Sequence, residues 1–491
     1  LYVYVYVTGR NEGNMDKIRI AFIEPRADNL NIFSRYNLPR LGSPLLATIM
    51  KEKGYQTEVF FIHEKELGRV SIECDIAAIS TITATAPQAY RMADSFRAQG
   101  VPVIMGGPHV TFLPEEALAH ADYAVLGEGE ETLPLLVEAI RTHTPAGDVP
   151  NLAYREQGEV RYTAQKPFTA PLDSLPFPDF SLVNYGIRKR LHHLFLKQII
   201  PVQTSRGCPY DCTFCSVTGM FGKRYRFRST ESVIRELEQY NPKKQKIFFY
   251  DDNFAANRRR TKELLHAMIA RDFQFTWSTQ VRTDIAKDPE LLDLMYRAGC
   301  RVLFIGFESV DPASLAAMKK SQTVEDIQYS IQQIHAYNIH VHGMFVFGFD
   351  TDTKSSMRAT IRFAIKEGID TAQFMILTPL PGSDFYKDME THGRIVSTDW
   401  NRFDAHHVAF KPKNVSPFAL QLMQIEAHTR FYSPVNVLKK LFRNKWGAFL
   451  IGMYAHKLNQ KWLKAEKFYL NTLKRFTRRS FPSHSSQTET N

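Results

Sequence analysis

Hydrophobic and polar positions along residues 16–145 form repeated strand–helix units. Short apolar runs predict strands at 17–24, 56–62, 76–80, 101–105 and 123–126. Amphipathic stretches between them predict helices at 45–53, 86–99 and 131–142. Strands and helices that alternate at this pitch predict an α/β fold with a doubly wound, Rossmann-like parallel sheet.

The carboxyl ends of these strands lead into loops rich in glycine and small hydroxyl residues, at 81–85, 106–111 and 127–131. Ligands bind doubly wound sheets at this edge, and glycine lets the backbone approach a bulky ligand closely. The loops supply the candidate ligand-binding residues Ser80, Thr81, Thr83, Gly106, Gly107, Gly127, Glu128 and Gly129.

Residues 196–385 repeat the strand–helix pattern six times. Strands are predicted near 199–204, 246–251, 274–279, 301–307, 341–347 and 371–377. Helices are predicted near 230–240, 258–271, 288–298, 323–337 and 354–367. Six such units predict a partial parallel barrel of the TIM type, whose active site lies at the carboxyl ends of its strands.

Three of the five cysteines lie within eight residues, as Cys208, Cys212 and Cys215. This C-x3-C-x2-C run is typical of an iron–sulfur cluster held by three thiolates. A zinc site usually shows a second paired cysteine or histidine segment, and none follows. A disulfide framework does not suit an odd cysteine count in a chain this long. Cys74 and Cys300 stand beside predicted strands, and we expect both to be buried.

The cysteine spacing, Phe214 just before the last cysteine and the strand leading in resemble the radical S-adenosylmethionine (SAM) enzymes. The resemblance implies a [4Fe–4S] cluster whose open iron binds the amino and carboxylate groups of SAM. One electron from the cluster then cleaves SAM to methionine and a 5′-deoxyadenosyl radical. The family's strand-end positions imply the SAM-binding residues Phe214, Asp251, Asp252, Asn253, Gln280, Arg282, Glu308 and Val346.

Residues 16–145 resemble the cobalamin-binding domain joined to many radical SAM enzymes. The matching features are Ser80 and Thr83 in an S-x-x-T pattern, the G-G-P-H turn at 106–109 and the G-E-G-E turn at 127–130. The D-x-H-x-x-G motif that supplies a lower axial histidine is absent. The resemblance therefore implies cobalamin bound without a histidine ligand, and the alternative is a degenerate domain without a cofactor. We expect His109 near the ligand or at the surface, not on the metal.

The two resemblances together imply a cobalamin-dependent radical SAM enzyme that methylates an unactivated carbon through the 5′-deoxyadenosyl radical and methylcobalamin. The alternative is cyclisation, oxidation or C–C coupling of a lipid or tetrapyrrole without methyl transfer. A remote alternative is a non-catalytic cobalamin or cluster sensor. The implied partners are a small-molecule substrate, hydrophobic or lipid-like, and an electron donor such as flavodoxin or ferredoxin. No residue is assigned as a general acid or base.

The net charge of +11 is unevenly distributed along the 491 residues. Residues 435–479 carry twelve Lys/Arg and one acid, Glu466, whereas the remainder is neutral. A neutral enzyme body argues against a nucleic-acid partner. The basic segment, interleaved with aromatic residues, predicts either a helical cap with a solvated face or helices lying on an anionic membrane. With no secretory signal and no apolar run of eighteen residues, we expect a cytoplasmic protein, peripheral at the inner face of the membrane in the second case.

The expected organisation has six parts along the chain. These are an extension at 1–15, the cobalamin-binding domain at 16–145, a proline-rich linker with a hairpin at 146–195, the barrel at 196–385, a mostly helical domain at 386–479, and a disordered end at 480–491. A helix is predicted near 416–431. His192 and His193 are expected to be solvated, and His406 and His407 either to touch substrate or to be structural.

Overall fold

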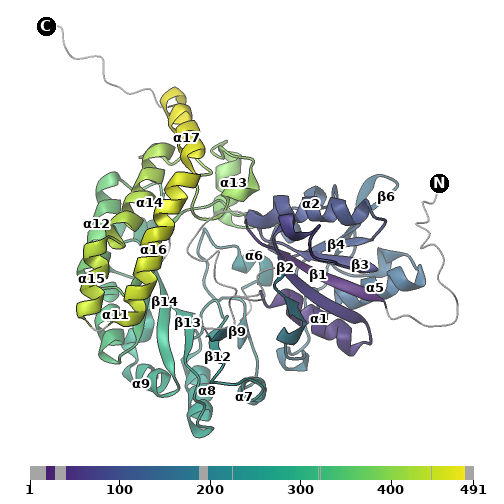
Figure 1. Cartoon of the computed structure of the whole chain (residues 1–491), viewed down its shortest axis with the longest axis horizontal. Helices are drawn as coiled ribbons and strands as arrows, with labels where there is room; N and C mark the ends of the chain where they lie inside the picture. The colour runs from purple at the N-terminus through teal and green to yellow at the C-terminus, as the bar shows by residue number, and fades with distance from the viewer. Residues whose placement is uncertain are drawn as a thin grey trace. The chain divides into compact units, whose positions relative to one another are not determined.

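The computed structural model describes residues 18–27, 40–186 and 197–480, apart from Arg224, Lys319, Ser321 and Asn444. The predicted extension, the His192–His193 pair and the end of the chain beyond 480 lie outside these residues. The described chain divides between Pro201 and Val202 into two units (Figure 1). Each unit has its own sheet.

The first unit has a parallel sheet at its centre, as the pattern of short apolar runs predicts. Its strands are β1 (Arg19–Pro25), β2 (Gln56–Ile62), β3 (Ile76–Ser80), β4 (Val103–Gly106) and β5 (Tyr123–Val125). They run side by side in the order β5-β4-β3-β1-β2, and every neighbouring pair is parallel. The α/β, Rossmann-like prediction is confirmed.

Residues from the proline-rich stretch extend both edges of this sheet. The predicted hairpin forms as β6 (Leu152–Glu156) and β7 (Glu159–Tyr162), and β6 pairs antiparallel to β5. The two-residue strand β8 (Val183–Asn184) pairs with β2 at the opposite edge. The stretch predicted as a linker therefore contributes strands to the first sheet.

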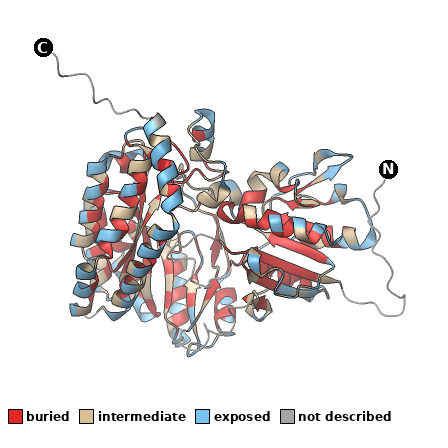
Figure 2. Cartoon of the chain, turned by 45° about the horizontal axis from the view of Figure 1, so that its top comes forward, coloured by how far each residue is buried: buried red, intermediate tan, exposed pale blue. Residues whose placement is uncertain are grey.

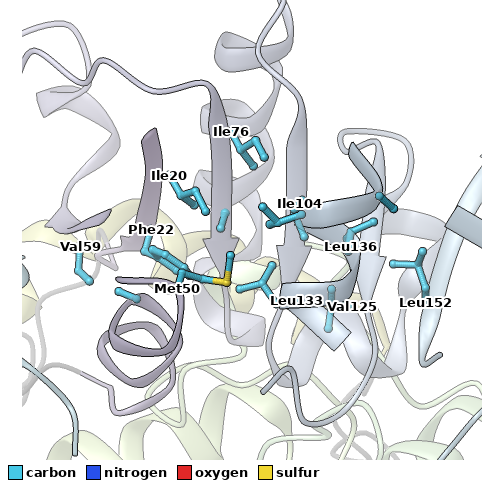
Figure 3. Packing of buried hydrophobic residues seen from close by; sticks show 14 of the residues in the cluster. Ile20, Phe22, Met50, Val59, Ile76, Ile104, Val125, Leu133, Leu136 and Leu152 are labelled. Carbon is cyan, nitrogen blue, oxygen red and sulfur yellow. The ribbon is translucent and has the colours of Figure 1, made fainter. Parts of the chain in front are cut away.

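Helices α1 (Gly42–Glu52), α2 (Ala86–Arg97) and α5 (Thr132–Thr142) pack on this sheet. Figure 3 shows Met50 of α1 and Leu133 of α5 meeting Phe22 and Ile104 of the strands. Each fully buried side chain of this size contributes about 1.5–3 kcal/mol to folding. The core therefore fixes the strand ends that carry the candidate ligand loops.

The second sheet has six parallel strands in sequential order, and all of it except most of its first strand belongs to the second unit. Its strands are β9 (Gln198–Val202), β12 (Gln245–Phe249), β13 (Trp277–Val281), β14 (Cys300–Glu308), β15 (His340–Phe347) and β16 (Thr371–Ile376). Its outer helices are α7 (Thr230–Leu237), α8 (Arg258–Ala270), α9 (Pro289–Arg297), α11 (Val324–Ala336) and α12 (Lys354–Lys366). The curled sheet with helices outside it is the predicted partial barrel (Figure 1).

The largest departure from a predicted strand span is in β13, which begins at Trp277 and not near residue 274. The register between β13 and β14 shifts at Trp277 and Ser278. The Trp277 amide donates to the carbonyl of Gly299, and its indole donates to the carbonyl of Ala298. These hydrogen bonds of the large, buried Trp277 fix where β13 begins. The pattern of apolar residues does not predict this position.

The helices that follow the strand-end loops begin at polar caps. At the start of α11, the Asp326 amide donates to the Thr323 hydroxyl and the Thr323 amide donates to the Asp326 carboxylate. Thr353 and Ser356 form the same reciprocal pair at α12. These capping boxes satisfy helix-end amides and fix where each strand-end loop stops.

The C-terminal residues of the second unit are helical, as predicted. They form α13 (Asp384–Thr391), α14 (Pro417–Phe431), α15 (Pro434–Phe442), α16 (Trp446–Ala465) and α17 (Lys467–Ser480). Helix α14 packs on α12 and on β16, the last strand of the sheet. Within the described chain, no helix has both the length and the apolar character needed to cross a membrane.

Candidate functional site

The three clustered cysteines lie in a loop at the carboxyl end of β9. Short strands β10 (Ser205–Arg206) and β11 (Arg226–Phe227) pair antiparallel and close the base of this cysteine loop, residues 207–216. The Cys215 amide donates to the Cys212 carbonyl over 3.1 Å, which gives the loop a tight turn. All three thiols are half-buried and free of disulfide bonds.

The thiols are close enough to affect one another electrostatically. Burial raises the pKa of Cys208, and the neighbouring Asp252 and Cys212 add to the effect. Burial and then the charges of Asp252, Cys212 and Cys208 raise the pKa of Cys215 to about 11. Thiolates are therefore unfavourable here unless a cationic group joins them, as a metal cluster would.

A [4Fe–4S] cluster fits this donor set better than a single metal ion. Among the residues that the structure describes, no three His, Cys, Asp or Glu side chains are grouped so that they could hold one ion. In a cluster each thiolate ligates a different iron, so its ligands need not meet at a point. Three half-buried thiols on one short loop meet that looser requirement.

Asp251, at the end of β12, holds the entrance of the cysteine loop. Its fully buried carboxylate accepts hydrogen bonds from the Thr204 amide (3.2 Å), the Thr204 hydroxyl (3.1 Å) and the Ser205 hydroxyl. Arg260 donates to the same Thr204 hydroxyl and to the Thr204 carbonyl. The resemblance implies that Asp251 binds SAM, but its carboxylate already accepts hydrogen bonds from Thr204 and Ser205.

Two further contacts hold the body of the cysteine loop. The Phe385 amide of α13 donates to the Thr213 carbonyl over 2.9 Å. The Phe214 ring meets Phe349 edge-on at 6.1 Å, just after β15. With these contacts and the Asp251 carboxylate, the loop is attached to several strand ends of its unit, which preorganises it.

Asp252 differs from its neighbour in being open to solvent. The surrounding protein removes part of the water around this carboxyl group, and this desolvation, followed by the charge of the Asp251 carboxylate, raises the pKa of Asp252 to about 7. Asn253 is buried, and its carbonyl accepts a 2.7 Å hydrogen bond from Tyr225. Of the adjacent acids, Asp252 is the one with a side chain available to a ligand.

The end of β13 carries Gln280, and Arg282, which follows the strand, contacts the cysteine loop. The Gln280 carbonyl accepts from the Phe254 amide, and the side chain is half-buried. The Arg282 guanidinium stacks on the Tyr210 ring of the loop at 3.9 Å, a cation–π contact. Its charge also opposes the rise in the pKa of Cys208.

Glu308, at the end of β14, forms a buried ion pair. Its carboxylate lies 2.7 Å from Lys320 Nζ, and both side chains are nearly inaccessible. The Glu308 backbone is left-handed, with φ of 61°. Lys320 Nζ also donates to the carbonyl of Gly306. Val346 is buried within β15.

In the first unit, the three predicted ligand loops lie on adjacent strands β3, β4 and β5. Thr81 is fully buried, and its hydroxyl lies 2.8 Å from that of Thr85. Gly107 has φ of 96°, and a Cβ there would lie 2.6 Å from the Thr81 carbonyl oxygen. A side chain at Gly107 would therefore force the first two loops apart.

The third ligand loop is more open. Gly127 has φ of 73°, and a Cβ there would meet nothing within 4 Å. Its amide donates to the Thr111 hydroxyl over 3.0 Å. The next residues of this loop, Glu128 and Gly129, are half-buried, as is Ser80 at the end of β3. Small residues and open space at this sheet edge fit a bulky planar ligand such as the corrin of cobalamin.

His109 is buried and not at the surface. Its Nε2 lies 2.9 Å from the Tyr90 hydroxyl and its Nδ1 lies 3.3 Å from the Thr83 hydroxyl. With both ring nitrogens engaged by the chain, His109 does not present a free nitrogen to a metal. This agrees with cobalamin bound without a histidine ligand.

The two candidate substrate histidines and the two isolated cysteines also have clear environments. His406 and His407 are buried, and His407 lies between Asp404 and Glu466. Both histidines are thus structural. Cys300 is buried as expected, whereas Cys74 is half-buried.

Sequence reasoning missed several residues that shape the site. Thr204 and Ser205 connect the cysteine loop to Asp251, and Lys320 neutralises Glu308. Asp352 accepts hydrogen bonds from the Gly348 and Phe349 amides and holds the turn after β15. Hydroxyl residues just before a cysteine run were the one available signal.

Comparison with known families finds one match in each part of the chain. Residues 31–137 match the B12 binding domain, and residues 202–364 match the radical SAM superfamily. Bacteriochlorophyllide d C-12(1)-methyltransferase of Chlorobaculum tepidum is 29% identical over 373 residues, covering 75% of this chain and 76% of that protein. Anaerobic magnesium-protoporphyrin IX monomethyl ester cyclase of Cereibacter sphaeroides is 27% identical over 454 residues, covering 87% and 72%.

Solved structures share the fold of both units. The radical SAM methyltransferase TsrM from Kitasatospora setae, solved with cobalamin and a [4Fe–4S] cluster, superimposes with a TM-score of 0.61. That match is 17% identical and covers 78% of this chain and 76% of TsrM. The likeness is one of architecture, since the sequences have diverged widely.

Proposed function

This chain is a radical SAM enzyme with a B12-binding domain, and on that premise we propose that it methylates an unactivated carbon of a hydrophobic small molecule. The observation that carries the proposal is the cysteine loop, with its three half-buried thiols anchored by a buried carboxylate at a barrel strand end. A loop held in this way keeps three ligands in place for a cluster while leaving one iron for SAM.

Individual residues have distinct proposed roles in the second unit. Cys208, Cys212 and Cys215 ligate the cluster. Asp252, open to solvent beside the thiols, accepts from the ammonium of SAM. The remaining proposed SAM contacts are Phe214, Asn253, Gln280, Arg282, Glu308 and Val346.

Two of these contacts have competing partners within the chain. Arg282 stacks on Tyr210, which leaves the guanidinium edge able to donate to a carboxylate. Glu308 is paired with Lys320, so acceptance from the ribose would share the carboxylate with that ammonium. Asp251 acts through the loop that it holds and is a positioning residue.

The first unit is proposed to hold cobalamin through its three strand-end loops. The residues are Ser80, Thr81, Thr83, Gly106, Gly107, Gly127, Glu128 and Gly129. Gly107 keeps two loops close, and Gly127 leaves space for the ligand. When bound, the cluster supplies the electron that cleaves SAM and cobalamin supplies the methyl carrier; the chain positions substrate and excludes water.

A second candidate function, radical cyclisation or oxidation without methyl transfer, is favoured by the cyclase among the relatives. Deuterated-methyl SAM separates the two. The anaerobically reconstituted, cobalamin-loaded enzyme is incubated with reductant, labelled SAM and a panel of tetrapyrroles and polycyclic lipids. Methylation predicts products with one added, labelled methyl group. Products altered without label, alongside 5′-deoxyadenosine, would favour the second function.

The proposed partners follow from this chemistry. Reduction of the cluster requires an electron donor, for which a flavodoxin or ferredoxin is the expected class. A hydrophobic substrate would be met at a membrane surface, which accords with a protein peripheral to the inner face of the membrane. No nucleic-acid partner is proposed, because the charge excess lies in the C-terminal helices alone.

A further inference from the structure

Helices α15 and α16 form an antiparallel pair with an exposed apolar face. The two helices pack closely, since a Cβ on Gly452 of α16 would lie 2.9 Å from the Val437 side chain of α15. Six of the fourteen exposed large hydrophobic residues of the described chain fall within this short hairpin. We call them the hairpin face: Val435, Leu438, Phe442, Trp446, Leu450 and Met453.

The spacing of the hairpin face shows that each helix presents one stripe. Val435, Leu438 and Phe442 follow each other at helical intervals of three and four, as do the three residues of α16. Phe442 is 87% exposed and Trp446 59% exposed, on either side of the turn between the helices. Large apolar residues gathered in this way on a surface mark an interaction site.

Lys and Arg side chains surround the hairpin face and continue along the next helix. Of the eleven Lys/Arg side chains that the structure describes within 435–479, nine are exposed: Lys439, Arg443, Lys457, Lys461, Lys464, Lys467, Lys474, Arg475 and Arg478. Glu466, the one acid in this segment, is half-buried and lies 3.5 Å from His407. Figure 2 shows exposed residues along the outer side of these helices. The outer surface of the hairpin is therefore both apolar and strongly cationic.

The exposed stripe of α16 changes character along its length. It begins with Trp446, Leu450 and Met453 and continues with Lys457 and Lys461 at the same helical spacing. Apolar residues near the turn and lysines farther along suit a helix whose one end enters the lipid headgroup layer. The lysine stems can lie along apolar surface while their ammonium groups meet anionic headgroups.

The hairpin is attached firmly to the barrel. Lys440 points inward and donates to the Asp370 carbonyl, and Lys445 Nζ lies 2.5 Å from the Asp370 carboxylate. Just before α15, the Tyr432 hydroxyl donates to the Ala372 carbonyl of β16 over 2.6 Å. Any surface that binds the hairpin face would therefore hold the barrel in a fixed orientation.

Charge distinguishes among the occupants that would cover such a face. A second copy of the chain in a two-fold dimer would bring the same surface against itself, and the nine exposed cations would repel. Crossing a bilayer is excluded for the described helices. An anionic bilayer offers apolar depth and negative charge together, which matches both parts of the surface.

We propose that the α15–α16 hairpin docks this protein on an anionic membrane, with the hairpin face inserted among the headgroups and the surrounding Lys/Arg on anionic phospholipids. The proposal goes beyond the proposed reaction and does not depend on it. Docking would present the barrel unit to lipid-dissolved molecules.

Vesicle flotation of the full-length, cofactor-loaded protein tests the proposal. Phosphatidylcholine vesicles with and without phosphatidylglycerol are compared at low and high salt. We expect at least tenfold stronger partitioning onto the anionic vesicles at low salt, and its loss at high salt. Equal recovery on both vesicle types, or none on either, would overturn the proposal.

Paired variants separate the hairpin from general electrostatics. Lys457→Glu/Lys461→Glu should lower anionic partitioning about tenfold or more, whereas Lys53→Glu/Lys65→Glu, with the same net charge change on exposed residues of the first unit, should not. Phe442→Ser/Leu450→Ser should weaken partitioning, with Leu135→Ser as the exposed apolar control. Equal losses in test and control variants would count against the hairpin.

The fluorescence of Trp446 reports on the hairpin face in the wild-type protein, so this measurement does not require that substituted proteins fold. Its fluorescence should shift to shorter wavelength with anionic vesicles, and Trp446→Phe should remove the shift while the protein still floats. An unshifted spectrum with bound vesicles would place the contact elsewhere. Concentration-dependent dimerisation without lipid, abolished by Phe442→Ser/Leu450→Ser, would identify a second copy as the occupant and overturn the membrane proposal.

Discussion

Asp251 and Asp252 are adjacent in the sequence but have different environments. Asp251 is enclosed and accepts hydrogen bonds from Thr204 and Ser205, whereas Asp252 faces solvent beside the thiols. The two carboxylates therefore have different roles: Asp251 holds the cysteine loop, and Asp252 is proposed to bind the ligand.

Substitution of each acid should therefore have a different outcome. Asp251→Asn places an amide N–H₂ against hydroxyl and amide donors, and should lower the free energy of unfolding by about 2–4 kcal/mol and reduce iron retention several-fold. Asp252→Asn should retain iron but raise the Kd for SAM about tenfold, about 1.4 kcal/mol. Iron analysis and isothermal titration measure both, with exposed Asp148→Asn as the control. Iron loss in Asp252→Asn alone would reverse the two roles.

His109 allows a similar test in the first unit. Because both its ring nitrogens are engaged by Tyr90 and Thr83, His109→Gln should leave the coordination of bound cobalamin unchanged. Electron paramagnetic resonance of the cob(II)alamin form should show no histidine nitrogen splitting in either protein. Splitting that disappears in His109→Gln would make this residue an axial ligand.

At the scale of elements, a buried charge cluster joins the segment after β16 to α16 and α17. His407 Nδ1 lies 3.0 Å from Asp404, its Nε2 lies 3.5 Å from Glu466, and its ring contacts Trp462 and Tyr469. Burial alone would lower the pKa of His407, but the two carboxylates outweigh it and raise that pKa to about 9. The protonated histidine stabilises this packing.

The stability of this region should consequently fall as pH rises. A histidine with a raised folded-state pKa contributes its full stabilisation below its unfolded pKa of about 6.5 and loses it as pH approaches 9. Between pH 6.5 and 8 the free energy of unfolding should drop by about 2 kcal/mol from this group. Above pH 8, Lys440, whose pKa burial lowers to about 8, begins to act in the opposite direction.

Urea titrations of the wild type and His407→Gln at the two pH values check this expectation. The variant should start less stable and show a flatter pH dependence. Exposed His392→Gln serves as the control and should behave like the wild type. A wild-type slope that persists unchanged in His407→Gln would assign the pH dependence to another group.

How far the sequence predicts this protein also depends on scale. The strands and their strand-end loops follow from the alternating apolar runs, whereas the order of the strands in the first sheet does not. The hydrophobic pattern does not predict that Lys320 pairs with Glu308 or that Glu466 pairs with His407. Each of these ion pairs depends on how loops and distant helices fold back. The stacking of Arg282 on Tyr210 is of the same kind. The assignment of the site residues stays a prediction, and their partners within the chain could not be predicted from the sequence.

Across the whole molecule, we expect one cluster, bound by the three thiols of the cysteine loop. Reconstituted protein should hold about four irons. Replacing Cys208, Cys212 or Cys215 by Ala should remove them, because each thiolate ligates one iron and the loop offers no substitute. Cys300→Ala, which changes a buried thiol elsewhere in the same unit, should retain them. Iron loss in Cys300→Ala but not in the loop variants would disprove the assignment.

Cleavage of SAM by the reduced, cluster-loaded protein tests whether this chain acts as a radical SAM enzyme. The full-length chain is incubated anaerobically with SAM and dithionite, and 5′-deoxyadenosine and methionine are quantified by mass spectrometry. We expect both products in equal amounts from the wild type and Cys300→Ala, and neither above background from Cys212→Ala. A wild-type protein that carries its cluster and binds SAM, yet forms no more 5′-deoxyadenosine than Cys212→Ala, would contradict the assignment as a radical SAM enzyme.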